Sequence, residues 1–108
     1  MMYVDFTAGT KEYQLRINTR NIVALEKQLG CNPLSIFGDG NRIPTVTEMV
    51  VILHAALQQR HHGISLNDAY DIFDEYLVDN AATDFIPVII DIFKASGLIK
   101  NDEDDEKN

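Results

Sequence analysis

The sequence predicts a mainly α-helical protein, with an N-terminal β-hairpin, a bundle of about four helices and a disordered acidic C-terminal tail. Three observations predict this fold class. Apolar and polar residues alternate near the N-terminus, four later segments combine helical apolar spacing with capping residues, and residues 101–108 contain no apolar side chain. We therefore expect a single domain over residues 1–100 and a tail over residues 101–108.

Two alternating runs predict the hairpin. Residues 2–7 (MYVDFT) and residues 12–17 (EYQLRI) each place apolar side chains on one face, and the link between them contains Gly9. Glycine favours the tight turn that joins two antiparallel strands. Because a two-stranded hairpin is marginally stable in water, its apolar face must pack on the helices or pair with another sheet.

A first helix is predicted between a cap at Asn18 or Thr19 and a terminating glycine, Gly30. Glycine is suited to this end of a helix because it adopts the left-handed conformation without steric cost. Pro33 then marks the start of a short helical segment that contributes apolar side chains to the core. Residues 38–41 have the composition of a loop.

The central helix is the most strongly signalled element. It is predicted over the segment from Ile43 to Arg60, with Arg60, His61 and His62 in its last turn and Gly63 ending it. Thr45 is a predicted N-cap, and Glu48 follows it at the spacing of a capping box. Pro44 prevents the helix from extending backwards. Apolar residues cover more than half of the helix surface, so neighbouring segments must cover it from more than one side. These apolar residues are Val46, Met49, Val50, Ile52, Leu53, Ala56 and Leu57.

A third helix is predicted from Leu66 to about Val78, with Ser65 as its N-cap and Asp68 three residues further on. Its apolar and acidic residues fall on opposite sides, which is typical of a helix that lies on the surface of a domain.

The last helix is predicted to begin at a cap provided by Thr83 or Asp84, to include Pro87 in its first turn and to end before Gly97. It has almost no polar face. Such a helix is either the second half of the core or an oligomer interface.

Charge and composition exclude several classes of function. The net charge is −8 and the pI is about 4.6. This charge disfavours binding to nucleic acid or to an anionic membrane surface. No apolar run approaches the roughly 20 residues of a membrane-spanning helix. Residues 101–108 carry five acids and one lysine, a net charge of −4, and serve either to dock a basic partner or to keep the chain in solution.

No catalytic, cofactor or metal constellation is recognisable, so we expect a protein that is not an enzyme. The adjacent His61 and His62 diverge by about 100° on a helix, and His54 lies two turns from His61. The single cysteine, Cys31, is interpreted as a partly buried structural residue. Three acids of the third helix are interpreted as a solvated surface: Asp71, Asp74 and Glu75.

The order of these elements is similar to that of a known protein family. The first helix ends with Leu-Glu-Lys-Gln-Leu-Gly, and Asn32-Pro33-Leu34 follows it. The central helix opens with Pro-Thr-x-x-Glu and closes at Ala55-Ala56-Leu57. The third helix starts with Ser65-Leu66-x-x-Ala69. Over roughly residues 12–80 the chain resembles the small tail assembly chaperones of long-tailed bacteriophages, including relatives in gene transfer agents and Gram-positive prophages.

This resemblance implies a non-enzymatic protein of the host bacterial cytoplasm that is absent from the mature virion. It implies binding to the long tape measure protein and assistance in recruiting tail tube protein. A different hypothesis is a small acidic regulator, or nucleic-acid mimic, that sequesters a basic protein through the acids between Asp102 and Glu106.

Protein interaction is assigned to two places in the chain. On the last helix the candidates are the exposed parts of Phe85, Ile89, Ile92 and Phe93, and at the hairpin edge they are Tyr3 and Tyr13. For each of these residues the alternative is burial in the core. Taken together, the surplus of apolar surface predicts a homo-oligomer, at least a dimer.

Overall fold

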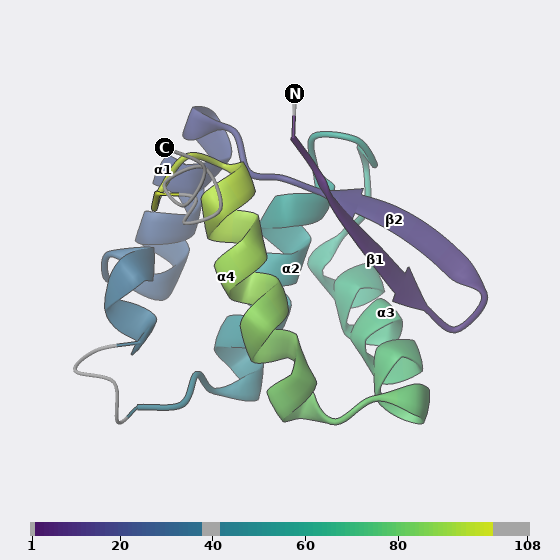
Figure 1. Ribbon diagram of the computed structural model, residues 1–108. Coiled ribbons are helices and arrows are strands. Elements are labelled where there is room, and N and C mark those ends of the chain that lie inside the picture. The colour runs from purple at the N-terminus through teal and green to yellow at the C-terminus, as the bar shows by residue number, and fades with distance from the viewer. Residues whose placement is uncertain (1, 38–41, 101–108) are drawn as a thin grey trace, which may run out of the picture.

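The computed structural model describes residues 2–37 and 42–100, and it confirms a hairpin followed by four α-helices (Figure 1). The predicted loop at residues 38–41 and the predicted tail at residues 101–108 lie outside the described residues. In chain order the elements are β1 (Val4–Ala8), β2 (Lys11–Leu15), α1 (Thr19–Leu29), the 3₁₀ helix η1 (Pro33–Phe37), α2 (Val46–Leu57), α3 (Leu66–Asp79), the 3₁₀ helix η2 (Ala82–Asp84) and α4 (Phe85–Ala95).

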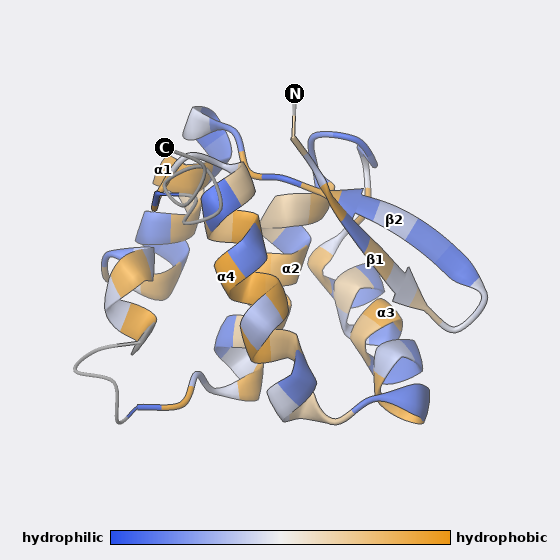
Figure 2. Ribbon diagram, in the orientation of Figure 1, coloured by the Kyte–Doolittle hydropathy of each residue, from blue (hydrophilic) through white to orange (hydrophobic). Residues whose placement is uncertain are grey.

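The central helix α2 is the centre of the core, as its sequence predicts. Eight of its 12 residues are buried, and it contacts α1, α3, α4 and β2. In Figure 1 α1 and α3 lie on opposite sides of it, and Figure 2 shows apolar residues concentrated on α2 and α4. A helix that is apolar on most of its surface is stable in water only when other elements enclose it in this way.

The hairpin packs its apolar face on α3 and α4. Its strands are antiparallel with Phe6 opposite Tyr13, and the turn contains Gly9 at a φ of 64°. Phe6 is buried against Tyr76 of α3 and Phe85 of α4, with ring centroids 4.9 and 5.7 Å away. Aromatic pairs at these distances stabilise the packing beyond the burial of area alone.

Side-chain caps set the helix starts that the sequence predicts. Asn18 caps α1 by accepting a hydrogen bond from the backbone N–H of Asn21. The predicted capping box of Thr45 with Glu48 is present at α2, and the predicted cap Ser65 forms a second capping box with Asp68 at α3. These bonds satisfy N–H groups that a helix leaves without partners in its first turn.

The segment that follows β2 joins the hairpin to the ends of two helices. The backbone N–H of Arg16 donates to the carbonyl of Ala56 at 3.1 Å, and its side-chain Nε donates to the carbonyl of Ala95 at 3.1 Å. The N–H of Ile17 donates to Ser96 Oγ at 2.9 Å. Since the last carbonyls of a helix have no partner within it, the two bonds from Arg16 satisfy carbonyls of α2 and α4, and all three bonds hold β2 in place.

Two predicted boundaries differ from the structure. The helix α2 ends at Leu57 instead of continuing to Arg60, because the chain turns there and His61 binds the hairpin. The Asp84 side chain does not cap α4. It accepts from the N–H of Ala81 and starts the short helix η2 instead.

The capping box of α2 allows a test of helix stability. We expect Thr45→Ala to lower the free energy of unfolding by about 1 kcal/mol, because the N–H of Glu48 loses its hydrogen-bond acceptor. Chemical denaturation followed by circular dichroism measures this loss. Thr47→Ala is the control, since Thr47 is exposed within the same turn. Equal losses from the two variants would contradict a capping role.

Candidate protein-binding site

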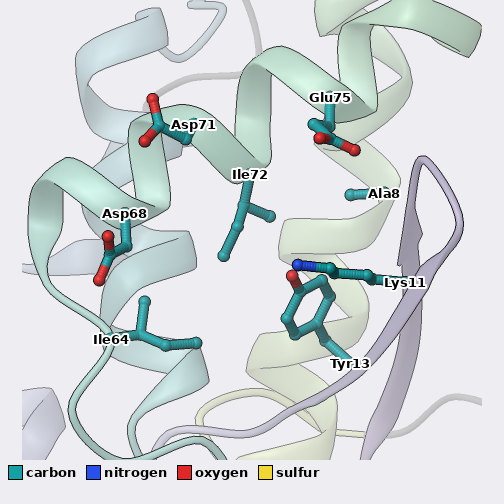
Figure 3. Close-up of a pocket in the computed structure, with 8 residues that line it drawn as sticks. All are labelled: Ala8, Lys11, Tyr13, Ile64, Asp68, Asp71, Ile72 and Glu75. Carbon is teal, nitrogen blue, oxygen red and sulfur yellow. The ribbon is translucent and has the colours of Figure 1, made fainter.

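A groove of about 340 Å³ lies between the hairpin and α3 (Figure 3). It combines an apolar base with charged side chains at its margin. The apolar part comes from Ala8, the ring of Tyr13, Ile64 and Ile72, and the charged part comes from Lys11, Asp68, Asp71 and Glu75. A groove of this composition is suited to an apolar side chain of a partner that also carries charge.

Helix geometry explains why three of these acids face the groove together. Asp68, Asp71 and Glu75 are spaced by three and four residues on α3, so they share one side of that helix. Ala69, Phe73 and Tyr76 occupy the neighbouring side and are buried in the core. The core contacts of α3 therefore decide which of its acids border the hairpin.

The groove has an acidic electrostatic character. Its three carboxylates and one lysine sum to a net charge of −2. Hydrogen bonds from the backbone N–H and the hydroxyl of Ser65 lower the pKa of Asp68, because they stabilise the ionised carboxylate. At one end the hairpin turn approaches α3 closely, since the Glu75 carboxylate occupies the space that a Cβ at Gly9 would need.

Tyr13 also lines a second hollow, between the hairpin and His61. The second hollow is also about 340 Å³ and is lined by Asp5, Glu12 and His61, among others. The ring of His61 meets the ring of Tyr13 edge-on, with centroids 5.2 Å apart. Tyr13 therefore borders both hollows. That it contacts a partner protein stays a prediction.

Tyr3, the other predicted hairpin residue, lies against the turn that follows α2. The guanidinium carbon of Arg60 is 4.9 Å from the centre of its ring, and Gln59 Nε2 donates to its hydroxyl at 3.4 Å. Tyr3 is half-buried and lies outside both hollows. A contact of Tyr3 with a partner stays a prediction.

The expectation that the last helix exposes an interaction surface is wrong for the folded monomer. Phe85, Ile89, Ile92 and Phe93 are all 0% exposed. Their positions on α4 face α2 and the hairpin, so the apolar surface that suggested an oligomer is used within the chain. The large apolar side chains that are exposed belong to other segments: Met2, Val23, Ile43, Val46, Tyr70, Leu77 and Val78.

The sequence reasoning missed the groove because it treated the acids of α3 as one solvated face. The structure separates them, with Asp71 and Glu75 on the groove and Asp74 away from it. The spacing of Asp68, Asp71 and Glu75 by three and four residues indicates that these acids share one side of the helix, and this pattern was visible in the sequence. Nothing in the sequence pattern indicated the contact between His61 and the hairpin.

Within residues 2–37 and 42–100, no cluster of three or more His, Cys, Asp or Glu residues could hold a metal ion. Cys31 is exposed, which corrects the expectation that it is partly buried. In the same part of the chain, every helix is too short or too polar to cross a membrane.

A substitution on α4 tests whether its buried residues belong to the core of the chain or to an interface between chains. We expect Ile89→Asp to unfold the protein or to cost several kcal/mol, because an unpaired carboxylate would be buried at a position with 0% exposure. Ile90→Asp is the matched control on the same helix, at a partly exposed position. Circular dichroism and analytical ultracentrifugation measure both variants. A folded Ile89→Asp monomer would instead indicate a dissociated oligomer.

His61 makes stability depend on pH. Its Nε2 accepts from the backbone N–H of Gln14 at 3.1 Å, which requires the neutral imidazole. Burial, and then the charge of Arg60, lower the pKa of His61 below 6.5. The unfolded chain therefore binds this proton more readily, so the stabilisation is complete above pH 6.5 and is lost as the pH falls below that value.

We expect His61→Gln to remove this dependence, because a glutamine oxygen accepts the same hydrogen bond without titrating. The measurement is the free energy of unfolding between pH 7.5 and pH 5, and His62→Gln is the matched control. A wild-type stability that is unchanged across this range would contradict the assignment.

The sequence matches the model of a protein family. The family model, described as a family of unknown function (DUF6096), matches residues 4–107. Comparison with curated proteins and with solved structures found no match. The family match spans the hairpin, all four helices and the groove between the hairpin and α3, so the chain belongs to the DUF6096 family.

Proposed function

We propose that this protein is a non-enzymatic tail assembly chaperone of a long-tailed bacteriophage or prophage. In this role it binds the tape measure protein and assists the assembly of the tail tube. Two motifs of the resemblance support the proposal through their positions in the fold. Pro44-Thr45-x-x-Glu48 opens α2, and Ser65-Leu66-x-x-Ala69 opens α3.

The observation that carries the proposal is the groove between the hairpin and α3. It offers apolar contact at Tyr13 and Ile72 beside the carboxylates of Asp71 and Glu75. A client that is long, helical and prone to aggregate needs its apolar residues covered by a partner that itself remains in solution. An acidic domain with an apolar groove meets both requirements.

The proposal places the protein in the host bacterial cytoplasm and outside the mature virion. It also includes a homo-oligomer. Because the apolar side of α4 is buried within the chain, self-association would use exposed residues such as Tyr70, Leu77 and Val78 on α3.

The acidic regulator is the second candidate function. The observation that favours it is the net charge of −4 over residues 101–108. Such a protein would sequester a basic partner through this segment and would need no groove.

Affinity capture distinguishes the two functions. We expect the full chain, co-expressed with the neighbouring gene products of its source genome, to capture a very long, helix-rich protein that mass spectrometry identifies. Deletion of residues 101–108 should leave most of this capture intact, because the groove lies within residues 8–75. Capture of a small basic protein that is lost with the deletion would overturn the chaperone proposal.

A further inference from the structure

We infer that the groove between the hairpin and α3 recognises an amphipathic helix of a partner protein, with lysine or arginine beside its apolar residues. This inference names the surface and the chemistry of the client, and so it rests on the proposed function. It follows from three features of the groove: its charge pattern, its apolar base and the hydrogen bonds already made along the edge of β2.

The charge pattern fits a helix with basic side chains. Asp68, Asp71 and Glu75 span two turns of α3, or about 10 Å along its axis. Basic residues spaced by three or four positions on a partner helix have the same repeat. Their ammonium or guanidinium groups would meet carboxylates along the whole groove, whereas an acidic or phosphorylated segment would be repelled.

The apolar base of the groove provides a surface on which an apolar side chain of the partner can be buried. Tyr13 and Ile72 are half-buried and line the groove from opposite walls, the hairpin and α3. Figure 3 shows the Tyr13 ring and the Ile72 side chain directed into the space between these elements. An apolar residue of the partner that enters this space would be shielded from water on both sides, with charged contacts at the margin.

The strand edge favours a helix over an added strand. β2 lines the groove, and two backbone N–H groups along its outer edge donate to the protein itself. The N–H of Gln14 donates to His61 Nε2, and that of Arg16 donates to the carbonyl of Ala56. Because β-augmentation depends on main-chain hydrogen bonds, an extended peptide gains little here, and a partner is recognised through its side chains.

The test uses the full chain and two designed peptides of about 18 residues, long enough to form helix when bound. One peptide has leucines along one face, flanked by lysines at positions i, i+3 and i+7, and the other replaces these lysines by glutamates. We expect the lysine peptide to bind at least about tenfold more tightly in isothermal titration calorimetry, and to weaken as salt is raised.

Two charge-matched double variants locate the binding. Asp71→Lys with Glu75→Lys reverses the groove, and Asp74→Lys with Glu26→Lys changes the total charge equally at exposed positions outside it. We expect the first pair to weaken the lysine peptide about tenfold or more, and the second pair to have a much smaller effect. Thermal unfolding establishes that both variants are folded. Equal weakening by the two pairs would overturn the inference, since binding would then follow net charge alone.

Amide chemical shifts provide a second readout that does not depend on the variants. The lysine peptide should shift the resonances of Tyr13 and Ile72 most strongly, and shifts confined to other segments would contradict the groove. The inference and the proposed function fail separately. Capture of the long client by the groove-reversed variant would leave the chaperone proposal standing without this surface. If the lysine peptide binds in the groove but no long client is captured, the inference about the groove stands and the chaperone proposal fails.

Discussion

The rest of the structure depends on the need to enclose α2. This helix is apolar on nearly all sides, and an isolated helix of that kind is not stable in water. Met49, Ile52, Leu53 and Leu57 are among the side chains that the surrounding helices and β2 bury completely or nearly so. The hairpin, which is too small to be stable alone, gains its stability from the same contacts. The hairpin therefore becomes stable only when the helical core forms, and it covers part of that core itself.

Arg16 shows how polar groups complete that packing. Its backbone binds the end of α2 and its side chain binds the end of α4, so one residue joins the hairpin to two helices. His61 adds a bond from the turn after α2 to Gln14 of β2. Together these bonds hold the hairpin beside α3, and this position creates the groove. The position of the groove therefore depends on these hydrogen bonds as well as on the core contacts of α3.

Most of the fold could be predicted because its signals are local. Caps such as Thr45 and Ser65, and the left-handed Gly30, act within a few residues of their own helix. The site could be predicted only in part. Tyr13 borders the groove, but Phe85 and its neighbours on α4 are buried, because an apolar helix face has the same sequence pattern whether it meets the protein's own core or another protein.

The elements, their order and the ends of most helices follow from the amino-acid sequence alone, since capping, turn formation and apolar periodicity are properties of short segments. Which apolar faces meet and which charges share a surface depends on the packing of the whole chain. This packing buries the apolar side of α4, ends α2 at Leu57 and places Asp71 and Glu75, but not Asp74, on the groove. These outcomes depend on contacts between residues far apart in the chain, such as Gln14 with His61, and no local pattern encodes them.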